Sequence, residues 1–458
     1  MTAEGRTKVS HRLRAARSDK HKHLITGSAV LVVGAAIQAA SGAIFWLIAA
    51  HLDSEHVVGA AGKLFTSVLF VTYLAGLGLP VALARYAADR SESSDVIFTR
   101  GVLATTAASV AGGLGYVALF HGSATGILTS AVNPVVGPLL FATMVIGAAL
   151  SMIVDVRCMT ARRWNFVMAR MTVVGLCRFP LLFLFRHASD DSRSLWLFVA
   201  AAAPVALSGI LGALFVPKVA GGTHRLGPKP AQYAQAVRYS GVNFVSTLAY
   251  QAPYFLLPVI VLAKVSNGSY ASFNVAWGIV AVAFYVPTAI GQALLAEGGR
   301  DGAKVSAQLR LAMTLAVGLM VAAAAAAFVG NGVVTKVYGQ PYHEAARILP
   351  VMVAAGIPWA ITSLYLAEVR ILHRHFATVA ITGALTAAIV VPALFLVPDR
   401  GVDGASVSWF VGNLVAAAVA IAAVRFSRRS AIPDATLGDS ATIVDVTEVG
   451  ITMAEHTA

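Results

Sequence analysis

Two arginines lie inside an apolar stretch that is long enough to cross a membrane. Residues 164–185 read WNFVMARMTVVGLCRFPLLFLF and contain Arg170 and Arg178. An arginine at the centre of a bilayer costs about 2.5–3.5 kcal/mol on insertion scales, so such residues usually face a bundle interior or a watery cavity. Arginine also holds phosphate through two parallel hydrogen bonds. The pair therefore predicts an anion-binding surface within the membrane.

The two arginines differ in their expected depth. Arg178 lies about 14 residues into its helix, roughly 20 Å at a rise of 1.5 Å per residue, near or just past the midplane. We expect it to face a watery cavity, and the alternative is a structural contact to a backbone carbonyl. Arg170 is shallower, so it either shares the same polar face or extends toward the near membrane surface.

Three more polar residues are candidates for contact with a transported molecule. Lys63 comes early in the second apolar segment, where it either reaches lipid headgroups or lines a cavity. Gln38 and Gln251 lie in the middle of apolar segments, and weak similarity between 37–52 and 250–265 aligns them. Their amides either bind sugar hydroxyls or join neighbouring helices.

Three charged residues at the ends of apolar segments are candidates for a gate. Arg85 closes the second segment, as an interface anchor or as a contact for an arriving headgroup. Asp155 ends the fourth segment beside Arg157, which favours a local salt bridge over a proton site. Glu297 ends the eighth segment near Arg300, and interface charge explains it best.

The sign of the deep charges predicts which molecules the protein accepts. Arg170 and Arg178 are positive, and we expect no carboxylate at a comparable depth. Such a potential favours anions over cationic drugs and leaves no obvious proton carrier. Outward movement of an anion across an inside-negative membrane is favourable by about 2.3 kcal/mol per charge per 100 mV. No cofactor is expected, and the energy source, a coupling ion or the membrane potential, stays open.

Composition places the chain in the membrane and excludes several other classes. Of 458 residues, 58% are hydrophobic and 12% charged, and the mean hydropathy is +0.76. The net charge of +13 is spread between apolar runs, which argues against nucleic acid as a partner. Cys158 and Cys177 are too few for a disulfide framework. No Ser/His/Asp, metal or Gly-rich phosphate pattern has usable spacing, so we expect neither an enzyme nor a metal site.

Hydropathy and charge together predict the topology. Twelve apolar windows are each long enough to form a transmembrane helix: about 25–50, 58–82, 98–120, 134–154, 165–185, 195–216, 240–263, 270–295, 307–330, 348–368, 376–397 and 405–425. Lys and Arg concentrate on one side, with 25 in the N-terminal arm, alternate connections and C-terminal edge, against six on the other side. By the positive-inside rule, both termini are cytoplasmic.

The chain is expected to divide into two similar halves. A basic arm (1–23) precedes a six-helix bundle (24–217), and a Gly-, Pro- and Lys-containing linker (218–239) leads to a second bundle (240–426). The final residues, 427–458, lose hydropathy and predict a disordered cytoplasmic tail. Both bundles enter the membrane in the same sense, as a parallel repeat requires. The expected fold class is an all-α integral membrane protein of about 12 transmembrane helices in a 6+6 arrangement.

Three stretches resemble one family of transporters. They are FWLIAAHLDSEHVVGAAGKLFTSVLFVTYLAGLGLPVALARYAAD (45–89), VYGQPYHEAARILPVMVAAGIPWAI (337–361) and VPDRGVDGASVSW (397–409). In order and spacing, the chain resembles the polysaccharide or lipid-linked oligosaccharide flippase branch of the multidrug/oligosaccharidyl-lipid/polysaccharide (MOP) exporter superfamily. The resemblance implies two helical bundles around a central cavity, and transport by rocking rather than by covalent chemistry.

The resemblance and the positive deep charges lead to one functional expectation with two alternatives. The protein is expected to be a multi-pass cell-membrane flippase that moves a polyprenyl-pyrophosphate-linked oligosaccharide from the inner to the outer leaflet for surface polysaccharide synthesis. Membrane lipids, a polysaccharide polymerase and glycosyltransferases are the expected partners. The alternatives are an ion-coupled multidrug exporter of the same superfamily, and a membrane scaffold that does not transport.

Overall fold

The computed structural model describes most of the chain between the arm and the tail. The described residues are 34, 37–38, 40–86, 92–120, 126, 128, 133–161, 163–184, 190–228, 233–298, 305–372 and 374–429. Within them the chain forms helices and turns and no strand, which confirms the all-α prediction. The predicted arm 1–23 and nearly all of the predicted tail 427–458 lie outside the described residues.

All twelve predicted windows correspond to helices in the described part of the chain. Nine of its helices are long and apolar enough to cross a membrane, and two shorter apolar helices, Ala40–Leu52 and Gln251–Lys264, match two more windows. The last of the nine is a helical hairpin, since α15 (His375–Arg429) bends at Gly401, where φ is 56° and ψ is −133°. Residues on either side of the bend pack together, because a Cβ on Gly412 would lie 2.2 Å from Ile389 Cγ1.

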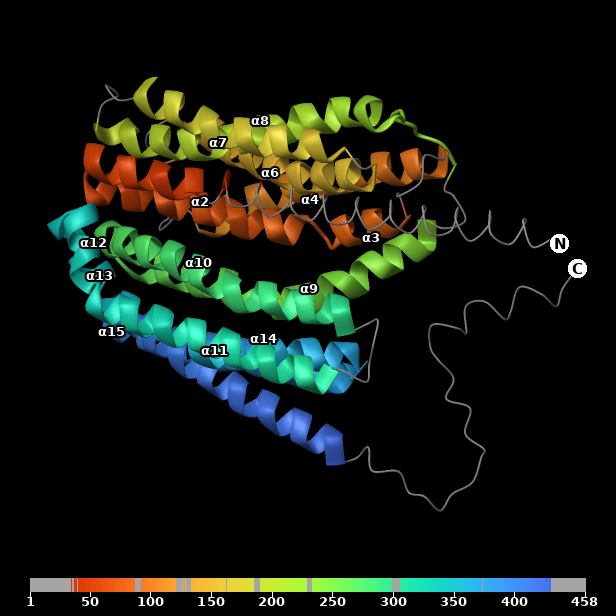
Figure 1. Ribbon diagram of the computed structural model, residues 1–458. Helices are drawn as coiled ribbons and strands as arrows, with labels where there is room; N and C mark the ends of the chain where they lie inside the picture. The colour runs from red at the N-terminus through yellow and green to blue at the C-terminus, as the bar shows by residue number, and fades with distance from the viewer. Residues whose placement is uncertain are drawn as a thin grey trace, which may run out of the picture.

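The helices form two layers that follow the order of the chain (Figure 1). The N-terminal half contains the first helix, 40–52, and the helices α2 (Glu55–Ala75), α3 (Leu79–Tyr86), α4 (Glu92–Leu119), α6 (Val136–Thr160), α7 (Trp164–Leu184) and α8 (Asp190–Ala220). The C-terminal half contains α9 (Tyr233–Lys264), α10 (Asn267–Gly298), α11 (Val305–Val329), α12 (Asn331–Tyr338), the turn η2 (Gln340–Tyr342), α13 (His343–Ala354), α14 (Gly356–Ile371) and α15.

Helices α2 and α3 of the N-terminal half pack on α9 and α10 of the C-terminal half. We call the side of the molecule where α8 ends and α9 begins the linker side, and the side where α9 ends and α10 begins the far side. In Figure 1 the linker side is at the right and the far side, with α12 and α13, is at the left.

The second predicted span is interrupted where the sequence reads GLG. Helix α2 ends at Ala75, and Leu77 and Gly78 have positive φ angles of 50° and 67° before α3 begins. A side chain at Gly78 would also collide with α9, because a Cβ there would lie 2.4 Å from the carbonyl oxygen of Ser240. Only glycine tolerates both the angle and the contact. The expectation of one continuous helix over 58–82 was therefore wrong, since hydropathy does not register a short backbone break.

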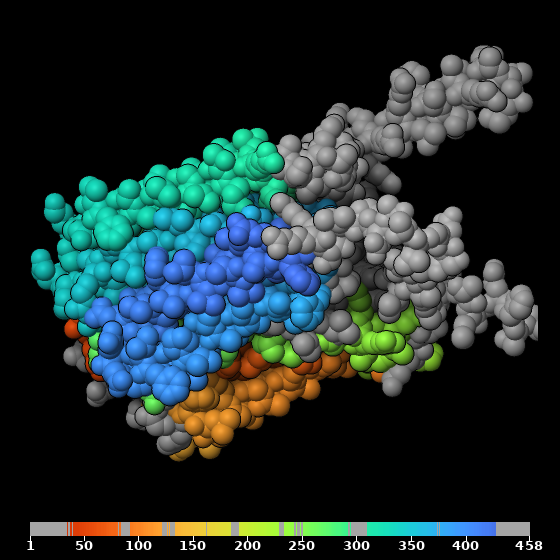
Figure 2. All heavy atoms as spheres, turned by 90° about the horizontal axis from the view of Figure 1, so that it is seen from below, coloured from red at the N-terminus to blue at the C-terminus, as the bar shows by residue number. Residues whose placement is uncertain are grey.

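The outer surface of the helices is apolar, as lipid contact requires. Viewed from below, helices α11 to α15 make up most of the face and α4 and α6 of the N-terminal half appear along one edge (Figure 2). Exposed apolar side chains lie along α11 and α15, among them Leu311, Leu315, Leu319, Leu394 and Phe395. These helices bury one face against the bundle and present the other to hydrocarbon.

Candidate functional site

Arg178 is buried between α7 and the first helix. The two helices lie side by side, since a Cβ built on Gly34 would lie 2.8 Å from Met171 Sδ, and one on Gly42 would lie 3.3 Å from Arg178 Nη1. Only 7% of Arg178 is exposed, and its Nε has no hydrogen-bond partner among the described residues. The guanidinium group is therefore almost fully buried, and the described part of the chain places no carboxylate against it.

Arg170 has a full set of partners inside the N-terminal half. Its Nε donates to Asp155 Oδ1 at 2.9 Å, its Nη2 pairs with the other carboxylate oxygen, and its Nη1 donates to Ser151 Oγ and Ser208 Oγ, each at 2.9 Å. Neither side chain of the ion pair is more than 16% exposed. Arg170 thus joins α6, α7 and α8, with its guanidinium group held by side chains of the N-terminal half.

The Arg170–Asp155 pair corrects the expectation that no carboxylate lies at the depth of the arginines, and it shows Asp155 in a salt bridge, as expected, but with a different partner. A carboxylate does lie at the depth of Arg170, namely Asp155, so the deep charge of this half is only partly positive. Asp155 also does not pair with the neighbouring Arg157, because residues two positions apart do not face each other on a helix. Arg157 instead donates to Asp95 Oδ1 at 3.0 Å. Asp155 therefore lies within one half rather than at a gate between the two.

Lys63 links the two halves on the far side. It is 6% exposed, and its Nζ donates to the carbonyl oxygen of Val265, at the end of α9, at 2.7 Å. Close by, Tyr270 on α10 donates its hydroxyl to Thr66 Oγ1 at 2.7 Å. Lys63 therefore does not line the cavity described below. Its contact was not foreseeable from the sequence, because its acceptor is a backbone carbonyl 202 residues away.

The linker side has its own contacts between the halves. Ser240 on α9 donates to the carbonyl oxygen of Leu77 at 2.6 Å, and the rings of Tyr73 and Phe255 stack with centroids 4.4 Å apart. The elbow between α2 and α3 therefore packs against α9. The gate candidates Arg85 and Glu297 belong to helices at this side, but their side chains lie outside the described residues.

The linker itself is attached to the N-terminal half over its first residues. The backbone N–H of Thr223 donates to Asp95 Oδ2 at 2.8 Å, while Asp95 Oδ1 accepts from Arg157. Arg100 Nη2 donates to the carbonyl oxygen of Gly227 at 3.0 Å. The buried ion pair of Asp95 on α4 with Arg157 on α6 therefore also holds the start of the linker.

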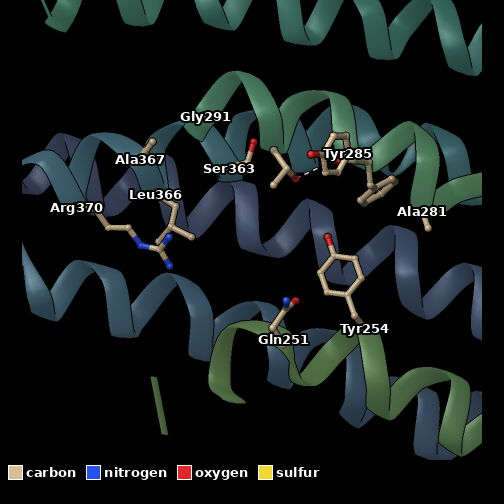
Figure 3. Close-up of a pocket in the computed structure, with 11 residues that line it drawn as sticks. Gln251, Tyr254, Ala281, Tyr285, Gly291, Ser363, Leu366, Ala367 and Arg370 are labelled. Atoms are coloured by element: carbon tan, nitrogen blue, oxygen red, sulfur yellow. Dashed lines mark hydrogen bonds between the residues drawn. The ribbon is translucent and has the colours of Figure 1, made fainter. Parts of the chain in front are cut away.

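A cavity of about 420 Å³ lies in the C-terminal half, between α9, α10 and α14 (Figure 3). Its lining is composed of aromatic, hydroxyl, amide and small apolar side chains together with one arginine: Gln251, Tyr254, Ala281, Phe284, Tyr285, Thr288, Gly291, Ser363, Leu366, Ala367 and Arg370. Among these described lining residues, only Arg370 carries a charge. The volume is typical of a site for a small molecule or a short headgroup.

Of the five cargo-binding residues expected from the sequence, the cavity contains Gln251 alone. Gln38 is half-buried on the first helix, where its carbonyl oxygen accepts from Ser41 Oγ at 2.9 Å. The two glutamines thus belong to different environments despite their aligned positions. The sequence carries little signal for Tyr254, Tyr285, Thr288 and Ser363, because uncharged polar residues are common in membrane helices.

Arg370 was not among the residues singled out in the sequence, because it lies at the end of a span and hydropathy does not show which residues line a cavity. Tyr285 and Thr288, three residues apart on α10, are the one local signal of a shared polar face. As for metals, the described residues contain no group of three or more His, Cys, Asp or Glu side chains that could hold an ion.

The fold matches known transporter structures at low sequence identity. It superposes on lipid II flippase MurJ in an inward closed conformation with a TM-score of 0.67, at 10% identity over 86% of this chain and 87% of that one. An inward-facing multidrug resistance MATE family transporter of the MOP superfamily gives 0.61, at 15% identity over 86% and 94%. A MOP superfamily transporter from Pyrococcus furiosus, described as having a binding pocket of reverse polarity, gives 0.50, at 15% identity over 88% and 93%.

Sequence comparison adds no closer relative, since no family model and no curated protein matches the chain. Identities of 10–15% establish the fold but not the cargo. The matches nevertheless cover nearly the whole described chain, including both bundles and the spans that the sequence predicted. The chain is therefore a multi-pass membrane protein whose fold is similar to that of these MOP superfamily transporters.

Proposed function

We propose that this protein is a flippase that carries an anionic, polyprenyl-pyrophosphate-linked saccharide from the linker-side leaflet to the far-side leaflet. The linker side faces the cytoplasm, in accordance with its excess of Lys and Arg. The saccharide supplies a surface polysaccharide, and the polymerase and glycosyltransferases of that process are the partners that would deliver and remove it.

The observation that carries this proposal is the buried charge of Arg178, which has no ion-pair partner among the described residues. A buried guanidinium group without a carboxylate is unfavourable, because desolvation is not offset by an ion pair. An anionic headgroup would remove that penalty, and a diphosphate would accept bidentate hydrogen bonds from arginine. Two buried carboxylates of the same half, Asp155 and Asp95, are paired with Arg170 and Arg157, and a third, Glu368, is buried on α14 of the C-terminal half. The potential around Arg178 itself therefore favours anions.

The contacts between the halves support an alternating mechanism. On the far side, Lys63 and Thr66 of α2 contact α9 and α10, and on the linker side the α2–α3 elbow contacts α9. Breaking one set while keeping the other would open a path to one leaflet at a time. No covalent step is involved, and the inside-negative potential favours outward movement of the anion.

The two other functions fit the charges less well. A multidrug exporter of cations would need an accessible acidic residue, whereas Arg178 repels cations and Asp155 already has a counter-ion. A MATE-like fold alone does not decide between the two, because one fold hosts several functions. A scaffold that does not transport gives no reason for a buried arginine that the described residues leave without a counter-ion.

The proposal is tested with the full-length protein in proteoliposomes. Undecaprenyl-pyrophosphoryl N-acetylglucosamine with a fluorescent sugar is loaded, and its arrival at the opposite leaflet is followed by quenching with a membrane-impermeant reductant. Arg178→Gln is expected to slow this transfer about ten- to a hundredfold, the range for losing hydrogen bonds to a charged group. Arg178→Lys, which keeps the charge, is expected to slow it less.

Arg310→Gln is the matched control, because Arg310 is exposed on α11, on the surface of the bundle. Rapid transfer by a well-folded Arg178→Gln protein would refute the role of this charge. Efflux of a cationic dye by wild-type proteoliposomes, with no lipid transfer, would support the multidrug exporter. If correctly oriented, folded protein shows neither lipid transfer nor dye efflux, this result would support the scaffold.

A further inference from the structure

The cavity of the C-terminal half has the chemistry of a saccharide site. Its polar groups are an amide (Gln251), two phenols (Tyr254 and Tyr285) and two aliphatic hydroxyls (Thr288 and Ser363), with no acidic residue among the described lining. Sugars present hydroxyls that both donate and accept, next to apolar C–H faces. The mixture of aromatic rings and neutral polar groups matches both kinds of surface.

Hydrogen bonds within the lining determine how it would meet such hydroxyls. Thr288 Oγ1 donates to the carbonyl oxygen of Phe284 at 2.9 Å, and Ser363 Oγ donates to that of Ala360 at 3.1 Å. Each hydroxyl has therefore used its hydrogen, so toward the cavity it is an acceptor. Gln251 brings both a donor and an acceptor, and the Tyr285 phenol is half exposed.

Arg370 lies at the linker-side end of this polar lining. It is on the last turn of α14, seven residues beyond Ser363, which places it roughly 10 Å nearer the linker side at 1.5 Å per residue. In Figure 3 its guanidinium group lies at one end of the cavity, whereas Tyr254 and Tyr285 lie toward the other. The cavity is thus polarised, with a cation near the membrane surface and neutral groups deeper inside.

We propose that this cavity is the entry site for the headgroup, where Arg370 binds the diphosphate and the lining around Tyr285 and Gln251 binds the adjoining sugar. This inference rests on the proposed function. The entry site precedes Arg178, which lies about 20 Å from the linker-side start of α7 and in the other half. The headgroup is accordingly first bound by the C-terminal half and later reaches the midplane arginine.

Equilibrium binding to the full-length protein in nanodiscs tests the site with three probes. Undecaprenyl-pyrophosphoryl N-acetylglucosamine has both groups, undecaprenyl pyrophosphate lacks the sugar, and glucosyl diacylglycerol lacks the phosphate. Arg370→Gln should weaken both diphosphate probes about ten- to a hundredfold and leave the neutral glycolipid unchanged. Tyr285→Ala should weaken the sugar-bearing diphosphate about tenfold and leave undecaprenyl pyrophosphate unchanged.

Arg374→Gln is the matched control, because Arg374 lies four residues from Arg370 and does not line the cavity. An equal loss in the Arg374 variant would show general surface attraction and overturn the assignment. Unchanged binding by folded Arg370→Gln and Tyr285→Ala proteins, with normal lipid transfer by the wild type, would overturn the entry site alone. Failure of the wild type to bind or transfer any diphosphate lipid would overturn the proposed function as well.

Discussion

A methyl group added at Gly59 should prevent the two halves from closing on the far side. Gly59 on α2 contacts the backbone at the start of α10, where a Cβ would lie 1.7 Å from the carbonyl oxygen of Asn267 and 2.5 Å from its carbonyl carbon. The obstacle is backbone rather than a flexible side chain, so no rotamer change relieves it. In Gly59→Ala, α2 and α10 must therefore move apart by more than ~1 Å for ordinary van der Waals contact.

The size of the effect follows from overpacking. Forcing extra atoms into a tight contact costs typically ~1–3 kcal/mol, and here the penalty applies only to the far-side-closed state. A conformation that separates α2 from α10 escapes it. The ratio of far-side-open to far-side-closed molecules should therefore rise about 5- to 150-fold, if the penalty is fully relieved on opening. The contacts of Lys63 with Val265 and of Tyr270 with Thr66 would be lost in the same step.

Cysteine accessibility measures this shift. Asn274→Cys places a thiol on α10 opposite Gly62, in a protein whose Cys158 and Cys177 have been replaced by alanine. A membrane-impermeant maleimide applied from the far side should label it faster when Gly59→Ala is also present. The matched control is Gly278→Ala, also on α10, whose added Cβ would meet nothing within 4 Å.

Equal labelling rates in the Gly59→Ala and Gly278→Ala proteins would refute this reasoning. The comparison requires that both remain monodisperse with similar unfolding temperatures, which separates a change of state from loss of folding.

Two further predictions concern buried ion pairs. Asp155→Asn should lower the free energy of unfolding by about 3–5 kcal/mol, because Arg170 keeps its charge but loses its counter-ion. Asp155→Leu combined with Arg170→Met should recover most of that loss. Equal unfolding temperatures of the wild type and Asp155→Asn in detergent would contradict this prediction. Asp95→Asn should weaken the hydrogen bond to the backbone of Thr223 and expose the linker, so trypsin should cleave after Arg225 faster than in the wild type. An unchanged cleavage rate would show that other contacts hold the linker.

Local sequence properties were sufficient for the fold class and for most of the spans. Hydropathy is a sum over neighbours in the chain, so each apolar window could be recognised without knowing its contacts. Hydropathy did not predict the break between α2 and α3 at the GLG sequence of window 58–82, because this break depends on two backbone angles and on the approach of α9. The hairpin bend at Gly401, by contrast, fell where two windows had already been separated.

The candidate site was less predictable, because burial alone does not identify a partner. In the sequence Arg170 and Arg178 differed only in their expected depth, yet Arg170 pairs with a carboxylate and two serines on neighbouring helices, while Arg178 lies against Gly42. The difference comes from which helix each side chain meets.

The sequence by itself determined that this protein spans the membrane, how many times, and which side carries the positive charge, because these depend on composition summed along short segments. Only the tertiary structure decided that Asp155 neutralises Arg170, that Lys63 joins the two halves, and that Gln251 shares a cavity with Arg370. Those relations depend on the rotation of each helix about its axis and on its neighbours. One residue shifts a side chain by about 100° around a helix, so hydropathy, which averages over several turns, carries no record of them.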